Sequence, residues 1–156
     1  MTGIDEGNDM NRFMKMAIEE ATEGITHGHG GPFGCVVVKD GTVIGHGHNE
    51  VLRQNDPTCH GEVMAIRDAC RTLGTYDLSG CELYTTAAPC PMCLGAILWS
   101  NITKYYFGCR VTDTADIGFR DDVFYSDPVY TAEETDREEC LELFRKYDSL
   151  RDKKIY

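Results

Sequence analysis

Apolar residues at helical spacing follow the start of the chain. They recur every three or four positions and leave the glutamates of the same segment on the opposite face. The apolar residues are Met10, Phe13, Met14, Ala17 and Ala21. Asp9 is placed to cap this helix, and Gly24, which precedes a glycine-rich run, is expected to end it. The pattern therefore predicts a helix that covers one face of a folded domain.

Two β-rich runs come next. Residues 33–39 and 42–48 are joined by Asp40-Gly41, a dipeptide that favours the tight turn of a β-hairpin. The polar stretch 49–57 has the composition of a loop. We therefore expect two antiparallel strands followed by an irregular connection.

The middle of the chain alternates helix and strand. After Asp56-Pro57-Thr58, a helix is expected to run until Gly74 stops it. Its apolar stripe consists of Val63, Ile66, Cys70 and Leu73. Residues 81–86 form a short predicted strand, 91–99 a second helix and 103–109 a further strand. Because strand–helix–strand connections favour parallel neighbours, these two strands should pair in parallel.

The sequence patterns that indicate helices and strands become less distinct after Cys109. Residues 111–122 have the pattern of a loop with a helical turn, 123–125 of a brief extended piece, and 131 to about 151 of an acidic helix. Together the elements predict one domain, residues 1–156, of the α/β class. We expect three layers, α/β/α, with a central mixed sheet of five strands.

Composition supports a single globular domain. The chain has 156 residues, of which 42% are hydrophobic, and no apolar run approaches the ~20 residues of a membrane span. Its first residues lack the basic and apolar regions of a signal peptide, so a cytoplasmic location is expected. Eight cysteines in such a chain favour thiols or metal ligands over disulfides, because reducing compartments keep thiols free.

The net charge limits the partners. With 26 acidic and 15 basic residues the formal charge is -11, and no cluster of lysine and arginine is present to bind a phosphate backbone. Nucleic acid and membrane are therefore not expected as partners. A small neutral base remains compatible with this charge.

Two short motifs carry the chemistry, and 26 residues separate them. The motifs are His60-Gly61-Glu62 and Pro89-Cys90-Pro91-Met92-Cys93. Proline suits the first helical position, so Cys90 should be the N-cap and Cys93 the third residue of a helix. The positive end of a helix lowers the pKa of a thiol and favours metal binding by the thiolate. His60 and Glu62 belong to the first turn of the preceding helix, so two helix N-termini should converge on one ion.

The donor set favours a catalytic zinc site. His60, Cys90 and Cys93 would leave the fourth position of a zinc ion open for water. Zinc lowers the pKa of such a water to about 7, and Glu62 beside it could carry a proton to a leaving group. These are the requirements of hydrolytic deamination. The alternative is a structural zinc site that Cys59 or another cysteine closes as fourth ligand.

On these motifs the chain resembles the cytidine-deaminase-like superfamily, and within it the small bacterial guanine deaminases. The similarity extends through nearly the whole chain. Outside the metal motifs it is carried by Gly30-Gly31-Pro32-Phe33-Gly34, Asp40-Gly41, Asn49, Asn55-Asp56-Pro57-Thr58, Trp99, Gly118-Phe119 and Lys153-Lys154-Ile155-Tyr156. The metal motif is typical of the superfamily, whereas the last two segments indicate the guanine branch.

The resemblance implies a function for the site. It implies one zinc ion per subunit and hydrolysis of guanine to xanthine and ammonia, with zinc-bound hydroxide as nucleophile and Glu62 as proton shuttle. It also implies that Asp121 assists the departing amine. The residues implied for substrate binding are Phe33, Asn49, Gly61, Trp99 and Tyr156. A homodimer that exchanges the segment 131–156 between subunits is expected on the same ground.

Each of these residues also has a purely structural explanation. Asn49 has the position of a strand-end turn residue, Phe33 and Trp99 of core aromatics, and Asp121 of a solvated carboxylate. Tyr156 could be a disordered chain end, although an apolar and aromatic tip after a lysine pair is more typical of a tail that docks. The histidines outside the motif are expected to be exposed side chains rather than ligands; they are His27, His29, His46 and His48.

The substrate is left open by departures from the family pattern. Gly61, Cys59 and Ala88 differ from the residues that guanine deaminases usually carry there. Residues 85–89, taken with His60-Gly61-Glu62, are similar to fungal-type cytosine deaminases. Cytosine, guanosine or another aminated heterocycle is therefore the alternative substrate. Further alternatives are tRNA adenosine deamination and a zinc-stabilised interaction module without enzyme activity.

Overall fold

The computed structural model describes residues 10–126 and 130–156. They belong to two compact units, Met1–Tyr125 and Ser126–Tyr156, which are described separately. Asp9, the predicted helix cap, lies outside the described residues.

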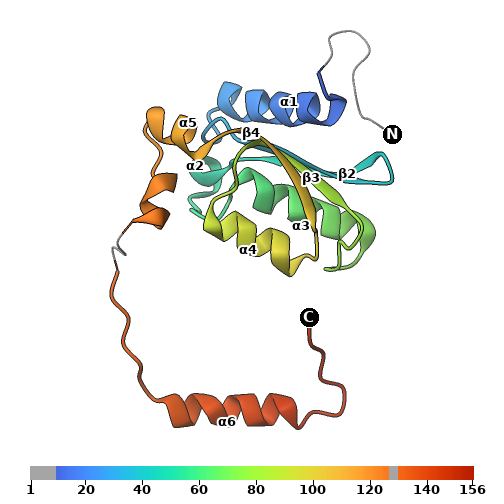
Figure 1. Ribbon diagram of the computed structural model, residues 1–156. Helices are drawn as coiled ribbons and strands as arrows, with labels where there is room; N and C mark the ends of the chain where they lie inside the picture. The colour runs from blue at the N-terminus through green and yellow to red at the C-terminus, as the bar shows by residue number, and fades with distance from the viewer. Residues whose placement is uncertain (1–9, 127–129) are drawn as a thin grey trace. The chain divides into compact units, whose positions relative to one another are not determined.

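One mixed sheet forms the centre of the first unit (Figure 1). Its strands are β1 (Gly34–Lys39), β2 (Thr42–His48), β3 (Glu82–Ala87) and β4 (Lys104–Cys109), in the spatial order β2-β1-β3-β4. β1 is antiparallel to β2 and β3, and β3 is parallel to β4. The predicted hairpin and the predicted parallel pair are both confirmed. At the hairpin, Asp40 and Gly41 have φ values of 49° and 78°, as a two-residue turn of this kind requires.

The prediction of a fifth strand is wrong for the described residues. The sheet there has four strands. Residues 123–125 belong to the 3-10 helix η1 (Asp121–Tyr125). Only three residues carried the extended pattern, and Asp121-Asp122 before them favours a turn or helix start over a strand. All six residues of β4 remain exposed.

Helices cover both faces of the sheet and complete the predicted three layers. Figure 1 shows α1 (Arg12–Thr26) on one face and α3 (Gly61–Leu73) with α4 (Pro91–Trp99) on the other. Two short helices, α2 (Val51–Gln54) and α5 (Val111–Asp116), interrupt the connections. The α2 turn falls in the stretch 49–57 that was expected to be irregular.

Helix α1 differs from its prediction at both ends. Asn11 is its N-cap, with a side chain that accepts hydrogen bonds from the backbone N–H groups of Phe13 and Met14. Gly24 does not end the helix but lies buried within it. A Cβ added at Gly24 would lie 2.7 Å from Cδ2 of His48, so glycine is needed there for close packing and not for chain reversal.

Helix α3 packs on β2 through small residues. Ala65 and Ala69 are fully buried, and added Cβ atoms at Gly45 and Gly47 of β2 would lie 2.6–2.7 Å from backbone atoms of α3. This close approach shifts the buried stripe by one position. The predicted residues Ile66, Cys70 and Leu73 are half-buried and pack against the core from its side; Val63 is also half-buried.

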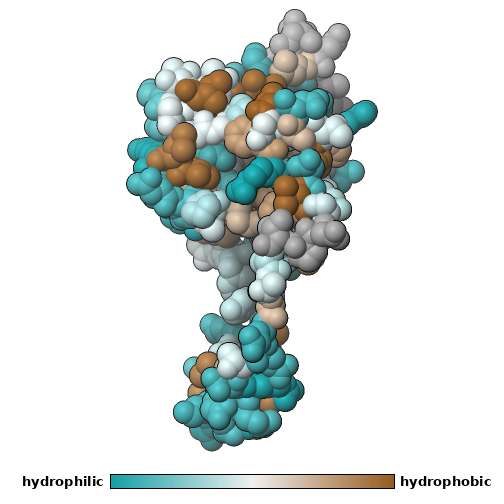
Figure 2. Space-filling model, turned by 90° about the vertical axis from the view of Figure 1, so that its left-hand side faces the viewer, coloured by the Kyte–Doolittle hydropathy of each residue, from teal (hydrophilic) through white to brown (hydrophobic). Residues whose placement is uncertain are grey.

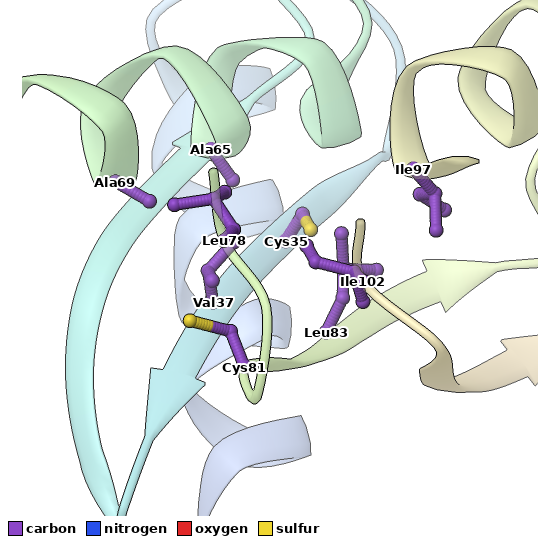
Figure 3. Packing of buried hydrophobic residues seen from close by; sticks show 9 residues of the cluster. All are labelled: Cys35, Val37, Ala65, Ala69, Leu78, Cys81, Leu83, Ile97 and Ile102. Carbon is purple, nitrogen blue, oxygen red and sulfur yellow. The ribbon is translucent and has the colours of Figure 1, made fainter. Parts of the chain in front are cut away.

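The main core lies between the sheet and the helices α3 and α4. Figure 3 shows its side chains pointing toward one another from strands, helices and the connections between them. The members are Cys35, Val37, Ala65, Ala69, Leu78, Cys81, Leu83, Ile97 and Ile102. Packing from both layers fixes the helix N-termini on the sheet, and these ends carry the predicted site.

The second unit contains α6 (Arg137–Asp148), which is shorter than the predicted helix at 131–151. None of its described residues is buried. Among all described residues, no helix has both the length and the apolar character needed to cross a membrane.

Candidate functional site

Three predicted ligands come together at two helix ends. His60 is the N-cap residue of α3 and Cys90 the N-cap residue of α4, with Pro91 at the first helical position as expected. The Nδ1 atom of His60 lies 3.6 Å from Sγ of Cys90 and 3.5 Å from Sγ of Cys93. The two sulfur atoms are 3.7 Å apart. The arrangement of donor atoms therefore follows the prediction from the motif spacing.

These distances fit a tetrahedral zinc ion. Zinc bonds of about 2.3 Å to sulfur and about 2.0 Å to nitrogen place the donor atoms of a tetrahedron about 3.8 Å apart for two sulfurs and about 3.5 Å apart for sulfur and nitrogen. The observed triangle has these dimensions, and its donors are of the type that zinc prefers. Both cysteines are buried and His60 is half-buried.

Cys59 does not complete a closed site. Its thiol lies beside Asp56, and it is not part of the group of ligand atoms formed by the other three residues among the described part of the chain. Three protein ligands thus leave one position of a tetrahedral ion available, as in catalytic zinc sites. Cys59, the fourth ligand proposed for a structural zinc site, is therefore not in place to bind the ion.

The hydrogen bonds among His60, Cys90 and Cys93 change the pKa values of these side chains. The hydrogen bond between the Cys90 and Cys93 sulfur atoms, supported by His60, lowers the pKa of Cys90 to about 4, although burial acts in the opposite direction. The same hydrogen bond, together with burial, raises the pKa of Cys93. Contact with Cys90 raises the pKa of His60. The lowered pKa of Cys90 favours its thiolate, which is the form of cysteine that binds a metal ion.

Glu62 is buried beside this group, with 5% of its surface exposed. Its Oε1 atom accepts a hydrogen bond from the hydroxyl of Thr85, a fully buried residue of β3. The hydrogen bond fixes one carboxylate oxygen and the orientation of the other. Sequence reasoning missed this role of Thr85, because 23 residues separate the partners and only the packing of α3 on the sheet joins them.

Asp121 lies within electrostatic reach of the ligand group. Its pKa is raised, first by burial and then by the negative charge of Cys90, while His60 acts in the opposite direction. Nearby, the rings of Phe33 and Phe119 form an edge-on pair with centroids 5.0 Å apart. The carbonyl oxygen of Phe33 would lie 3.1 Å from a Cβ added at Gly61, so the backbone of Phe33 borders the first turn of α3.

Asn49 is also held close to this turn. It is 5% exposed, and its backbone N–H donates to the carbonyl oxygen of Phe33 at 2.9 Å. Its side-chain Oδ1 accepts a hydrogen bond from the N–H of Val51 at 3.1 Å. The structure thus brings Asn49 and Phe33 together beside Gly61, and places Asp121 within electrostatic reach of the ligand group.

Trp99 and Tyr156 are not brought to this group within the first unit. Trp99 is the last residue of α4 and 66% exposed, whereas Cys90 and Cys93 are at the other end of that helix. Six residues of helical rise separate Trp99 from Cys93 by about 9 Å along the axis. Tyr156 belongs to the second unit and is 74% exposed.

Known proteins share the sequence and the fold. A family model, the cytidine and deoxycytidylate deaminase zinc-binding region, matches residues 8–109. The guanine deaminase of Bacillus subtilis (strain 168) is 50% identical over 122 residues, which are 78% of this chain and 78% of that protein. The X-ray structure of guanine deaminase from Bacillus subtilis is similar with a TM-score of 0.88 at 43% identity, and the match covers 93% of this chain and 97% of that chain.

A second group of relatives is similar over less of the chain. The tRNA-specific adenosine deaminase of Aquifex aeolicus (strain VF5) is 45% identical over 95 residues, which are 61% of this chain and 62% of that protein. The similarity to guanine deaminase therefore extends further along the chain and is closer than the similarity to this tRNA enzyme.

Proposed function

The chain belongs to the cytidine and deoxycytidylate deaminase family and is a zinc-dependent hydrolase of the deaminase type, and from this premise we propose that it converts guanine to xanthine and ammonia. The observation that carries the proposal is the similarity to guanine deaminase along nearly the whole fold, joined to a His/Cys/Cys group with a buried carboxylate beside it. We propose that the enzyme is cytoplasmic, because none of its eight cysteines forms a disulfide and reducing compartments keep cysteines in this state.

The net charge supports a small substrate over tRNA. A formal charge of -11 offers no favourable field for a polyanion. Guanine carries no phosphate and has no such requirement. The similarity of residues 85–89 to cytosine deaminases keeps cytosine as the competing substrate, which the experiment below separates.

His60, Cys90 and Cys93 would hold one zinc ion, which supplies Lewis-acid activation of the attacking water when bound. Hydrolysis forms a C–O bond at C2 of guanine and breaks the C–N bond to the amino group. Of the two protons of the water, one ends on a ring nitrogen and the other on the departing amine. Glu62, which is buried beside the ligand group, is proposed to carry both in turn.

The hydrogen bond from Thr85 makes the two carboxylate oxygens of Glu62 inequivalent. Because Oε1 accepts the Thr85 hydroxyl, we assign proton transfer to Oε2. Asp121 is proposed to assist the departing amine. Asn49 is proposed to hydrogen-bond the base, and Phe33 and the backbone at Gly61 to form the wall against which it lies.

We further propose a homodimer that exchanges the C-terminal segment. Large hydrophobic side chains stay exposed on the first unit, and Figure 2 shows several such patches on one of its faces. Leu98 and Trp99 at the end of α4 and Phe107 of β4 are among these exposed side chains. The second unit exposes Leu143 and Phe144 of α6. A surface of a second copy would cover both sets and bring Trp99 and Tyr156 to a site.

A substrate panel tests the proposed activity. The zinc-loaded protein is incubated with guanine, guanosine, cytosine and adenosine-containing tRNA, and ammonia release is measured. We expect guanine to be turned over fastest. Turnover of cytosine but not guanine would overturn the substrate, and absence of ammonia from every compound would overturn the enzyme activity.

The variant Glu62→Gln tests whether the ammonia is released by catalysis at this site. We expect it to keep its zinc and fold and to lose turnover at least about 100-fold, because the amide cannot relay protons. Glu19→Gln makes the same chemical change on the exposed face of α1 and should retain turnover.

A further inference from the structure

Four of the five histidines lie outside the group formed by His60, Cys90 and Cys93. His27 and His29 lie at and after the end of α1, and His46 and His48 belong to β2. The ring of His29 stacks on that of His48 with centroids 5.1 Å apart, and the ring of His27 stacks on that of His29 at 5.5 Å. His27 and His46 are exposed as expected, but His29 and His48 are half-buried, which contradicts the expectation of exposed side chains.

The central pair has the geometry of two ligands that share a proton. Nδ1 of His29 lies 2.8 Å from Nε2 of His48. A carboxylate oxygen of Glu50 completes a group whose three ligand atoms all lie within 4.8 Å of one another. Two imidazole nitrogens and a carboxylate oxygen form a donor set that binds borderline transition-metal ions.

Glu20 fixes the proton arrangement of His48. Its Oε2 accepts a hydrogen bond from Nδ1 of His48 at 2.9 Å, and its Oε1 lies against Nδ1 of His46. With its proton on Nδ1, the neutral His48 ring presents the lone pair of Nε2 toward His29. A carboxylate behind a histidine in this way is the usual partner of a metal-bound imidazole.

Glu50 retains capacity for a metal bond although it is already paired. Its Oε1 accepts from Arg53 at 2.8 Å and its Oε2 from Gln54 at 2.9 Å. Each carboxylate oxygen has two lone pairs, so both contacts leave acceptor capacity. The Glu50 side chain is 12% exposed, so neighbouring residues restrict its movement.

The surface next to the group favours cations. A hollow of about 700 Å³ is lined by His46, His48 and Glu50 and by further carboxylates of Glu19, Glu20, Glu23 and Asp68. Such a concentration of negative charge raises the local concentration of cations and repels anions. It also gives an ion a path to the ligand atoms.

We propose that His29, His48 and Glu50 form a second metal site, which takes a divalent zinc, cobalt or nickel ion with water in the remaining positions. The metal replaces the proton between the two rings. The proton of His29 Nδ1 moves to its Nε2, so both rings stay neutral and no proton is lost overall. Magnesium and calcium are excluded as occupants because they prefer sites made of oxygen ligands.

The site would clamp the loop after α1 to the end of β2. His48 and Glu50 flank Asn49 in the chain, and the carbonyl oxygen of His29 accepts the N–H groups of Leu52 and Arg53 at 3.0 Å. An ion bound here therefore stabilises the segment that holds Asn49. The proposal rests on this geometry and is independent of the substrate of the enzyme.

Titration of the zinc-loaded full chain with cobalt(II) tests the site. The chain carries the substitutions Cys109→Ser and Cys140→Ser, because these two thiols are exposed and bind metals without a site. We expect one further cobalt ion per chain, with the weak visible bands of nitrogen and oxygen ligands and no sulfur-to-cobalt charge transfer. Charge-transfer bands would show that cobalt has replaced the zinc among the cysteines. A second zinc ion per chain in equilibrium dialysis is the matching expectation.

Single substitutions distinguish the site from a general affinity of histidines for metals. His29→Gln, His48→Gln and Glu50→Gln should each weaken the second ion at least about tenfold while the first zinc is retained, and Glu20→Gln should weaken it by about tenfold. His27→Gln and His46→Gln, the matched controls, should retain it. His29 lies in a loop, so His29→Gln should not disrupt the core. Retained zinc and an unchanged thermal unfolding curve check that this variant folds.

Three results would overturn the proposal. The first is wild-type protein that binds no second ion. The second is binding that survives all three ligand substitutions. The third is binding that His27→Gln and His46→Gln reduce as much as His29→Gln, which would indicate metal adsorption by exposed rings.

Discussion

At the scale of single residues, the site depends on how one buried carboxylate is held. Glu62 is nearly inaccessible to solvent, and the Thr85 hydroxyl donates to its Oε1 atom. A buried carboxylate oxygen without a donor costs about 1–3 kcal/mol and is free to turn. Thr85 therefore acts as a positioning residue for the proposed proton transfer.

Thr85→Val tests this role because valine has nearly the shape of threonine but no hydroxyl. We expect kcat to fall about 10–100-fold with zinc content unchanged, since the carboxylate loses its orientation. Steady-state kinetics and metal analysis on the same preparation measure both quantities. Thr85→Ser restores the donor and should recover most of the turnover; a valine variant with wild-type kcat would exclude the positioning role.

The residues of the metal group could be predicted from sequence because their spacing is local. His60 and Glu62 share one helical turn, and Cys90 and Cys93 share another, so helix geometry brings together the members of each pair. That the two pairs meet was implied by the resemblance to the zinc deaminases. Thr85 could not be predicted, because its contact depends on how α3 lies on β3. Trp99 was placed in the pocket by resemblance alone, and helical rise puts it away from the ligands of its own chain.

At the scale of elements, close packing of α3 on β2 positions His60 and Glu62. Gly45 and Gly47 bring the strand so near the helix that an added Cβ would lie 2.6–2.7 Å from helix backbone atoms. Backbone cannot move as a flexible side chain does. The position of the α3 N-terminus, and with it one metal ligand, therefore follows from two glycines of a strand.

Gly45→Ala should disturb both stability and metal binding. We expect a loss of about 3 kcal/mol in the free energy of unfolding from overpacking, and weaker zinc binding because α3 shifts. Denaturant unfolding and zinc titration measure the two effects. Gly74→Ala is the control: it has open space but a φ of 67°, so it should cost about 1 kcal/mol and leave zinc affinity unchanged. Equal zinc affinity in both variants would contradict this account of the helix position.

Element types were predictable because hydrophobic period and turn residues are local signals. The hairpin at Asp40-Gly41 and the cap at Cys90-Pro91 are examples. Element ends were less predictable, because tertiary contacts override local preference. Gly24 continues α1 since it lies against His48, and residues 123–125 were too short a run to specify a fifth strand.

At the scale of the whole molecule, the second unit has no core of its own among its described residues. α6 exposes Leu143 and Phe144, and a helix of 12 residues is marginally stable without packing. The first unit likewise exposes large apolar side chains on α4 and β4. The proposed exchange of this segment between two copies would bury both sets of apolar side chains.

Light scattering coupled to size-exclusion chromatography tests the assembly. We expect the full chain to elute as a dimer, and Leu143→Ser with Phe144→Ser to shift it toward monomer and lower turnover. Glu139→Ser, an exposed polar position of α6, should leave the mass unchanged. A monomeric wild-type chain with full activity would rule out the exchange.

The central claim is that this chain hydrolyses guanine at C2 with Glu62 as proton carrier. Mass spectrometry of the product formed by the zinc-loaded protein in H₂¹⁸O tests it most directly. The account predicts xanthine that carries one ¹⁸O atom from wild-type protein, formed at least about 100-fold more slowly by Glu62→Gln that retains its zinc. Unchanged guanine with the wild type, or labelled xanthine at wild-type rate from Glu62→Gln, would contradict it.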